Sequence, residues 1–471
     1  MDYTMLDKIV ESHKDDLIAI IRRWISVNSV KGEAAPNAPF GPGPRKALDL
    51  ALEDAKRLGF ETEDVDGYAG SVRFGGAKAE MGILAHLDIV PAGDGWTKDP
   101  FGGEIENNRL NGRGTTDDKG PAAAALIAML SVKEAGIPLT DGVRLILGCD
   151  EETGMSDMKY YAEHRKTPDY GFSPDADYPL INIEKGGLSL ELSGRYDAVS
   201  GAELPIFSMT AGERINVVPG QAEAVIGCAD EDAFKAALDG LCAELGFTVK
   251  AEPAGDGKLR LIAIGQSAHA STPHLGKNAA GMLLILLDRL NAGGKAHDDI
   301  RFLAEKLGLD GTGKGLDLAQ SDEKSGALTC NLGILRFEDG ALSVKLDCRY
   351  PLCADKDRMI AAASDAVRGT SLTVGLISHH APHYVSEDHK VVKKLLKAYG
   401  DVTGLPAYAF AIGGGTYSRC MPNTVAFGIN FPGTVDMCHM PDEAVDIDRL
   451  MLSVRIMAHA IAELAGEQNA E

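Results

Sequence analysis

The sequence predicts an α/β fold in which a main domain, with a mixed, partly parallel β-sheet flanked by helices, is interrupted by an inserted α+β domain. Three observations support this prediction. The chain has 471 residues, more than a single compact core normally holds. Helical periodicity alternates with short apolar runs over residues 1–185 and again over 385–471, as in a partly parallel sheet. Between these regions, over 186–384, the residue pattern changes to one typical of short strands and hairpins.

Helices and strands alternate through residues 1–185. Apolar spacing and the Gly and Pro positions set their limits. A Pro/Gly-rich loop, KGEAAPNAPFGPGP, follows the first helix and is long for an inert connection. We expect helices at 5–27, 45–58 and 121–134, and strands at 61–65, 71–74, 81–85 and 143–147.

Residues 186–384 form the expected insert, which is long enough to fold as a domain of its own. The runs ALTCNLGILRF and ALSVKLDCRY flank EDG and predict a β-hairpin. Residues 385–471 return to the pattern of the main domain, with a glycine-rich loop between two helices. Further helices are expected at 231–245, 278–290, 358–367, 389–399 and 448–464.

Composition excludes several classes of function. The net charge of −22 argues against binding to nucleic acid or to an anionic membrane, because both require basic patches. No apolar run reaches the length of a membrane span. Acids from Asp7 to Asp16 interrupt the start, so a signal peptide is not expected. The eight cysteines are scattered without a CxxC pair, which favours the cytoplasm over an oxidising compartment.

Four segments place His, Asp and Glu at or just after probable strand ends. In α/β sheets, ligands bind outside the carboxyl ends of the strands, so these groups are candidates to converge. Each segment alone is more often a turn, a helix cap or a solvated loop, but four such accidents together are hard to explain. Carboxylates with some imidazole suit zinc, manganese or cobalt, and without a CxxC pair a closed structural zinc site is not expected. The segments are AHLD (85–88), GRGTTDDKG (112–120), CDEETG (149–154) and SPDAD (173–177).

These segments, together with MCHMP at 437–441, closely resemble the M20 family of co-catalytic metallopeptidases along nearly the whole chain. The chain length and the long insert are most similar to those of bacterial dipeptidases in that family. The resemblance makes 1–185 and 385–471 the two parts of a catalytic domain and makes 186–384 a lid domain. It implies two divalent metal ions, zinc in the first place, with manganese or cobalt as alternatives.

The resemblance also assigns roles to single residues. Asp117 would bridge both ions, and the peptide bond that follows it would be cis. Glu151 would be the general base and Glu152 a ligand, since neighbouring side chains on an extended segment point in opposite directions. Asp88 would accept the ring proton of His86. The implied metal ligands are His86, Asp117, Glu152, Asp175 and His439.

The insert would carry the rest of the site. His269, in GQSAHASTP, matches the family residue that stabilises the oxyanion of the tetrahedral intermediate. Asn216 and Arg349 match lid residues that meet the substrate, and a guanidinium suits the carboxylate of a dipeptide. The loop with Gly414, Gly415 and Thr416 matches a substrate-lining segment whose glycines let the backbone come close to a ligand.

We therefore expect a cytoplasmic dinuclear metallodipeptidase whose partner is a small peptide. The insert is about twice the size of one lid module, so a second module could replace a partner's lid and leave the enzyme a monomer. Another amide hydrolase, such as a deacylase or a carboxypeptidase-like enzyme, is the alternative within the family. A non-catalytic metal- or peptide-binding protein is the alternative outside it, although such a protein would not need Glu151 as a base.

Overall fold

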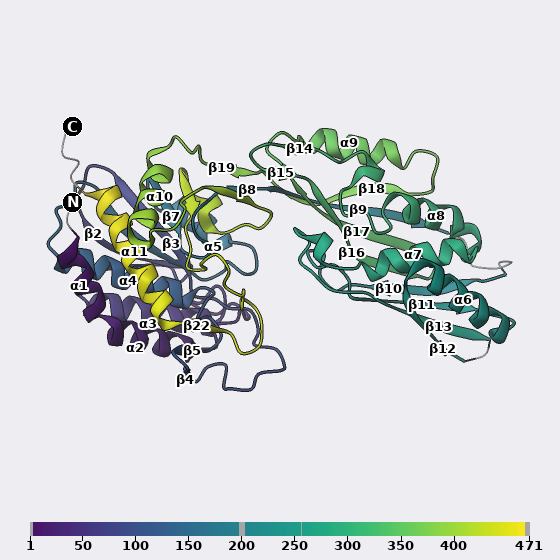
Figure 1. Cartoon of the computed structure of the whole chain (residues 1–471), viewed down its shortest axis with the longest axis horizontal. Helices are drawn as coiled ribbons and strands as arrows, with labels where there is room; N and C mark the ends of the chain where they lie inside the picture. The colour runs from purple at the N-terminus through teal and green to yellow at the C-terminus, as the bar shows by residue number, and fades with distance from the viewer. Residues whose placement is uncertain (1–2, 197–202, 256, 467–471) are drawn as a thin grey trace. The chain divides into compact units, whose positions relative to one another are not determined.

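The structure, a computed structural model, describes residues 3–196, 203–255 and 257–466 (Figure 1). The chain divides into two compact units. Unit 1 comprises Met1–Ile183, Tyr384–Phe410 and Gly415–Glu471, and unit 2 comprises Glu184–His383 and Ala411–Gly414. The short stretch 411–414 thus groups with unit 2, whereas the sequence pattern assigned it to the main domain.

Unit 1 is built on a mixed sheet in the order β1-β2-β6-β3-β7-β21-β8-β19, with β20 paired to β8. Strand β3 runs parallel to β6 and β7, and β7 runs parallel to β21, while β1–β2 and β2–β6 are antiparallel. The prediction of a mixed, partly parallel sheet is therefore confirmed. The strands are β1 Glu61–Val65, β2 Ala69–Gly75, β3 Glu80–His86, β6 Gly142–Gly148, β7 Tyr170–Ser173, β8 Ile181–Glu184, β19 His383–Tyr384, β20 Phe410–Ile412 and β21 Thr424–Ala426; a small separate sheet contains β4 Ile105–Glu106, β5 Arg109–Asn111 and β22 Ala444–Asp446.

Helices cover both faces of this sheet. The Ala-rich α4 is buried along nearly its whole length, because α1, α2, α11 and strand β3 surround it and small side chains allow close approach. On the opposite face, Met158 and Tyr161 of α5 and Tyr417 of η4 join Leu84 and Ile146 in a smaller cluster. The helices are α1 Thr4–Ser12, α2 Lys14–Ile25, α3 Pro42–Arg57, α4 Lys119–Glu134, α5 Ser156–His164, α10 Lys390–Thr403, α11 Ile447–Ala465 and the 3₁₀ turn η4 Tyr417–Cys420.

The expected single helix from Met5 to Val27 is wrong, because α1 and α2 are separate. The break is at His13, whose φ of −95° and ψ of 12° depart from helical values. Its ring contacts Asp16 (2.9 Å) and Glu134 of α4 (2.8 Å). Apolar spacing continues across the break, so periodicity alone does not reveal it.

Unit 2 has an α+β architecture. Its main sheet, in the order β12-β13-β11-β10-β16-β17-β9-β18, is antiparallel throughout. The predicted hairpin is confirmed, since Glu338 of β16 pairs with Ala341 of β17. The strands are β9 Gly186–Arg195, β10 Ile206–Ala211, β11 Gln221–Gly227, β12 Thr248–Pro253, β13 Lys258–Ile264, β16 Thr329–Glu338, β17 Ala341–Tyr350, β18 Thr373–His380 and the separate pair β14 Ser321–Asp322 and β15 Gly326–Ala327; the helices are α6 Glu231–Leu245, α7 Ala279–Arg289, α8 His297–Lys306, α9 Lys356–Ala366 and the 3₁₀ turns η1 Pro273–Leu275, η2 Gly294–Ala296 and η3 Lys314–Leu316.

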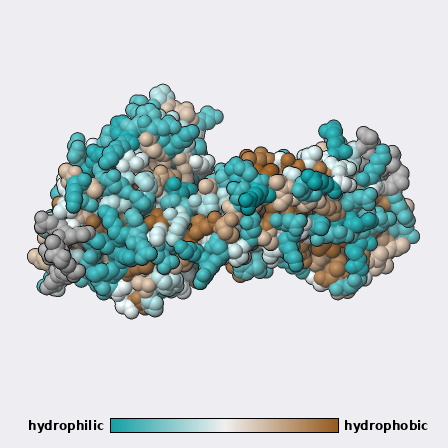
Figure 2. Space-filling model, turned by 90° about the horizontal axis from the view of Figure 1, so that it is seen from above, coloured by the Kyte–Doolittle hydropathy of each residue, from teal (hydrophilic) through white to brown (hydrophobic). Residues whose placement is uncertain are grey.

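Apolar side chains form separate cores in the two units. The face drawn in Figure 2 is mostly hydrophilic, with apolar side chains in scattered patches. Within the described ranges, no helix is both long enough and apolar enough to cross a membrane.

The centre of the unit 1 sheet yields a stability prediction. Gly171 of β7 lies opposite Gly82 of β3, and a Cβ at Gly171 would come within 2.1 Å of the Gly82 carbonyl oxygen. We expect Gly171→Ala to lower the free energy of unfolding of unit 1 by at least ~1–3 kcal/mol, the usual cost of overpacking. Urea denaturation followed by tryptophan fluorescence measures this change, because Trp24 and Trp96 both lie in unit 1.

Gly240→Ala is the matched control, since the same methyl group would meet nothing within 4 Å in the exposed part of α6. We expect it to leave unit 1 unchanged and to stabilise α6 by ~0.5–1 kcal/mol. A Gly171→Ala protein as stable as the wild type would contradict the packing described for β3 and β7.

Candidate active site

Three of the four polar segments follow the parallel neighbours β3, β6 and β7, and the fourth leads into α4. Strand β3 lies between β6 and β7. His86 is the last residue of β3, and the segment CDEETG follows β6 directly. Asp175 follows β7 by two residues, and Asp117 lies two residues before α4. The carboxyl ends of parallel strands thus bring imidazole and carboxylate groups to one place.

Asp117 lies between two histidines. Its Oδ1 is 2.9 Å from His86 Nε2, and its Oδ2 is 2.9 Å from His439 Nε2. In the described part of the chain, His86 Nε2 is buried and makes no hydrogen bond of acceptable geometry, despite its nearness to Asp117. A ring nitrogen and a carboxylate oxygen that converge without a shared hydrogen bond are suited to binding a cation.

One further carboxylate lies near each of the two histidines that contact Asp117. Asp175 Oδ2 is 3.7 Å from His86 Nε2, and Glu152 Oε1 is 3.2 Å from His439 Nε2. Ligand atoms of His86, Asp117 and Glu152 all lie within 4.8 Å of one another. The residues present fit two divalent cations, each with one imidazole, one carboxylate of its own and one oxygen of Asp117.

Charge at this edge of the sheet is strongly coupled. Hydrogen bonds to the carboxylates of Asp117 and Glu152 raise the pKa of His439 to about 10. Burial tends to raise the pKa of Asp117, but His439 and His86 outweigh it and the pKa falls. Burial, followed by the charge of Asp117, raises the pKa values of Glu152 and Asp175. Carboxylates that resist ionisation in this way are stabilised when positive charge is placed among them.

Asp88 holds the segment that carries the two glutamates. Its Oδ1 accepts the main-chain N–H of Glu151 (3.2 Å), and its Oδ2 accepts that of Glu152 (3.1 Å). His86 Nδ1 lies closer to the main-chain oxygen of Asp88 (3.0 Å) than to its carboxylate (3.4 Å). The expectation that the carboxylate takes the ring proton therefore needs adjustment: the main-chain carbonyl is the nearer acceptor, and the carboxylate positions Glu151 and Glu152.

The three acids of the CDEETG segment have different surroundings. Asp150 is buried, pairs with Lys31 (2.7 Å) and accepts hydrogen bonds from Thr153 and Ser156, so it shapes the turn. Glu152 faces His439. No hydrogen bond or ion pair of the Glu151 carboxylate occurs among the described residues, and burial raises its pKa well above the usual value.

A buried carboxylate not singled out from the sequence, Glu443, joins the loops of Asp117 and His439. It is fully buried, and its Oε1 accepts from Gly114 N (3.0 Å) and from both the N and Oγ1 of Thr116 (2.8 Å each). Its Oε2 pairs with the buried Arg113 at 2.6 Å. Glu443 follows His439 by four residues, so it fixes one ligand loop against the other.

Asp118 holds the main chain of His86, the last residue of β3, in place. Its Oδ2 accepts the main-chain N–H of His86 (2.9 Å), and its side chain is fully buried. The peptide bond between Asp117 and Asp118 is cis, which confirms the expectation from the family resemblance. The two neighbouring aspartates thus serve different partners, one the histidine rings and the other the backbone.

Unit 2 groups its own set of expected residues. His269 Nδ1 lies 2.7 Å from Ser271 Oγ and 3.2 Å from Ser271 N, and it accepts from that main-chain N–H in the neutral tautomer that carries its hydrogen on Nε2. The main-chain oxygen of Asn216 accepts from Ala270 N (2.9 Å), and Val217 forms a β-bridge with His269. The Asn216 segment therefore supports the segment that carries His269.

Arg349 lies in the same unit and is already paired. Asp347, two residues earlier on β17, accepts from its Nε (2.6 Å) and Nη2 (2.9 Å), and Gly413 O accepts from its Nη1 (3.0 Å). A Cβ at Gly413 would lie 2.4 Å from Ser271 Cβ, which explains a glycine there. Gly414 belongs to unit 2, whereas Gly415 and Thr416 belong to unit 1, where Thr416 caps η4.

Comparison with known proteins is consistent across sequence and fold. The model of Peptidase family M20/M25/M40 matches residues 82–463. The putative dipeptidase YtjP of Bacillus subtilis (strain 168) is 39% identical over 96% of this chain and 98% of its own length. The β-Ala-Xaa dipeptidase of Lactobacillus delbrueckii subsp. lactis is 38% identical over 98% of both chains. The crystal structure of aminoacylhistidine dipeptidase from Vibrio alginolyticus is 16% identical, covers 96% of this chain and 97% of its own, and matches the fold with a TM-score of 0.58.

The contacts of Glu443 predict a role in metal affinity. In Glu443→Gln, a side-chain amide would point at main-chain N–H groups and leave Arg113 without its counter-charge. We expect metal affinity to fall by about 10- to 100-fold, as is usual when a group that orients a ligand is lost. Titration of the metal-free protein with zinc against a chelating dye measures this affinity.

Glu463→Gln is the control, because Glu463 of α11 pairs with Lys397 of α10 (2.9 Å) and, among the described residues, contacts none of the site. We expect it to bind zinc as the wild type does. Thermal unfolding of the metal-free variants separates a weakened site from a weakened fold. Unchanged zinc affinity in Glu443→Gln would contradict the prediction.

Proposed function

Because the chain belongs to Peptidase family M20/M25/M40, it is a metallopeptidase, and we propose that it hydrolyses the peptide bond of dipeptides at a centre of two divalent metal ions. The dipeptidase names of the two relatives at 38–39% identity support this substrate class. The observation that carries the proposal is the position of Asp117, whose two oxygens each lie 2.9 Å from a different histidine.

In this proposal Asp117 would hold both ions. His86 and Asp175 complete the ligands of one ion, and Glu152 and His439 those of the other, in line with the distances within each half. Zinc is the first expectation, and manganese or cobalt would suit the same oxygen-rich donor set. The 3.0 Å contact of His86 Nδ1 with the Asp88 carbonyl would fix the ring with Nε2 toward the metal.

The residues around the metal centre have different roles in the proposed reaction. When bound, the two ions lower the pKa of a water molecule between them. Glu151 would take a proton from the attacking water and pass it to the leaving amine, and its carboxylate makes no hydrogen bond or ion pair among the described residues. His269 donates from Nε2 to the oxygen of the attacked carbonyl as negative charge develops there.

Arg349 would bind the free carboxylate of the dipeptide. Asp347 occupies its Nε and Nη2, so the guanidinium is held in one orientation before substrate arrives. Asn216, Gly414, Gly415 and Thr416 would line the rest of the substrate site. A carboxylate held next to the scissile bond favours short peptides with a free C-terminus.

The proposal extends to the cellular setting. All eight cysteines are free thiols, which suits the reducing cytoplasm. We propose a monomer, because the insert is about twice the size of one lid module and could itself supply a second module in place of a partner's lid. Neither nucleic acid nor membrane is expected to bind a chain of net charge −22.

A substrate panel tests the proposed function. The zinc- or manganese-loaded protein is assayed with dipeptides, tripeptides and N-acetyl amino acids, with and without a chelator. We expect chelator-sensitive hydrolysis of dipeptides at the highest kcat/KM. Faster turnover of N-acetyl amino acids would favour a deacylase, faster removal of C-terminal residues from tripeptides a carboxypeptidase-like enzyme, and metal binding without turnover a binding protein.

The two adjacent glutamates should fail in different ways. We expect Glu151→Gln to keep the metal content of the wild type and to lose at least about 10²-fold in kcat, because a proton-transfer group typically contributes 10²–10⁴-fold. Glu152→Gln should bind less metal, since it removes a ligand oxygen near His439. Metal analysis beside dipeptidase kinetics measures both effects, and equal metal loss in the two variants would contradict this division.

Mixing two inactive variants tests the monomer proposal. His269→Ala and Glu151→Ala are combined under conditions that let subunits exchange. If each His269 serves the metal centre of its own chain, we expect no recovery of activity in the mixture. Recovered activity would show that the lid acts on a partner. Either recovered activity or a stable dimer in sedimentation at assay concentrations would contradict the monomer proposal.

A further inference from the structure

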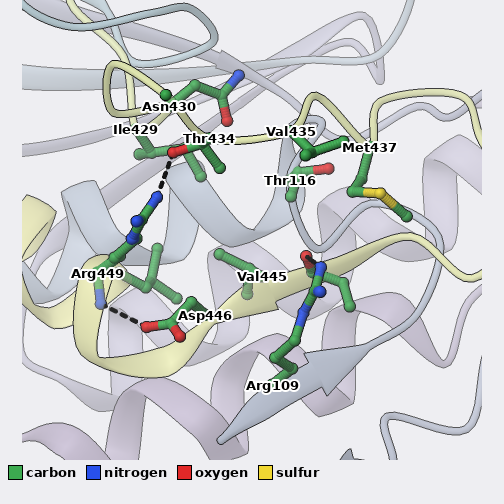
Figure 3. Close-up of a pocket in the computed structure, with 13 residues that line it drawn as sticks. Arg109, Thr116, Ile429, Asn430, Thr434, Val435, Met437, Val445, Asp446 and Arg449 are labelled. Atoms are coloured by element: carbon green, nitrogen blue, oxygen red, sulfur yellow. Dashed lines mark hydrogen bonds between the residues drawn. The ribbon is translucent and has the colours of Figure 1, made fainter.

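Unit 1 contains a cavity whose lining includes none of the proposed catalytic residues. It has a volume of about 420 Å³, within the range of small-molecule sites. Its walls come from β5, β22, the first turn of α11 and the loop 429–437. Figure 3 shows Arg449 and Arg109 on opposite sides of this cavity, with Val445 between them.

Both arginines are held at the wall without an acidic partner. Arg109 Nη2 donates to Ala444 O (3.1 Å), and Arg449 Nη1 donates to Thr434 Oγ1. No salt bridge of either guanidinium occurs in the described part of the chain. Asp446, the one acid of the lining, accepts the main-chain N–H of Arg449 (3.0 Å) as the cap of α11. Two guanidinium groups that form no salt bridge among the described residues therefore face the same space, against a single carboxylate.

The wall between the arginines is apolar. Ile429, Val445 and Leu450 are buried and line the cavity, and Figure 3 shows Val445 between the two guanidinium groups. A ligand that fits has an anionic group for the arginines and a branched aliphatic body for the apolar wall. Charge complementarity excludes an aliphatic cation, and the apolar wall disfavours a bare inorganic anion.

The cavity adjoins both loops that carry expected metal ligands. Thr116 lines it and directly precedes Asp117, and Met437 lines it two residues before His439. We propose that this cavity is a binding site for small branched aliphatic carboxylates, which contacts the metal centre through these loops. Such a carboxylate could arrive as the free end of an amino-acid product, so the link to turnover rests on the proposed function; the binding itself does not.

Direct binding tests the site without turnover. The metal-loaded protein is titrated calorimetrically with 4-methylpentanoate, and with 4-methylpentanamide as the uncharged probe of the same shape. We expect the carboxylate to bind at least tenfold more tightly than the amide. We also expect Arg109→Gln/Arg449→Gln to weaken carboxylate binding at least tenfold, and Arg109→Lys/Arg449→Lys to restore part of it.

Two controls separate this cavity from the substrate site. Arg358→Gln changes an arginine on α9 of unit 2, and Arg349→Gln changes the expected substrate-binding residue. Both should retain 4-methylpentanoate binding, and thermal unfolding checks that the double variant is folded. Binding lost with Arg349→Gln but kept in the double variant, or equal binding of acid and amide, would overturn the proposal.

Kinetics then distinguish how the carboxylate arrives. If the site binds a free carboxylate as an effector, 4-methylpentanoate should change kcat for a dipeptide, and the double variant should abolish the change. If the site instead receives part of the substrate, inhibition should be competitive and should likewise disappear in the double variant. Inhibition that persists unchanged in the double variant would contradict both.

Discussion

Repulsion among buried carboxylates is the constraint on which the rest of unit 1 depends. Asp117, Glu152 and Asp175 come together at the carboxyl ends of β3, β6 and β7, where burial opposes ionisation. His86 and His439 offset part of this charge by lying against the two oxygens of Asp117. Divalent cations would offset the remainder, since a bound ion is usually the largest local charge in such a site.

A second set of carboxylates has a structural role and holds irregular loops in place. Asp88, Asp118 and Glu443 are buried and accept main-chain N–H groups. Hydrogen bonds to an ionised acceptor are about twice as strong as neutral ones. These hydrogen bonds hold loops that lie outside the helices and strands, and Arg113 neutralises Glu443, which is fully buried.

The features that the sequence predicted correctly are those marked by a regular residue spacing or by a cluster of residues along the chain. Alternating periodicities indicated the mixed sheet, and the dense acids after β6 pointed to the edge where the site forms. Glu443 could not be found in this way, because an acid after Pro-Asp looks like a solvated turn and its partners lie about 330 residues earlier. The pairing of Arg349 with Asp347 has a local signal, two opposite charges at i and i+2 of a strand, but such pairs are common on exposed strands. The break at His13 depends on Glu134 of α4, which no local window contains.

Each half of the proposed site is organised within its own unit. The Asp117 and Glu152 segments are fixed by carboxylates of unit 1, while His269 is fixed by Ser271 and Arg349 by Asp347, all in unit 2. The two units also have separate apolar cores. Neither half therefore needs the other in order to hold its side chains ready, and preorganised groups contribute most to catalysis when they need not rearrange during the reaction. Any conformational change during turnover can then be confined to the points where the chain passes between units, at 183–184, 383–384, 410–411 and 414–415. Two of these crossings flank Gly413 and Gly414, so the short segment bonded to Arg349 is itself tethered at both ends to unit 1. A loop held in that way links the residue that would bind the substrate carboxylate to the unit that would bind the metals.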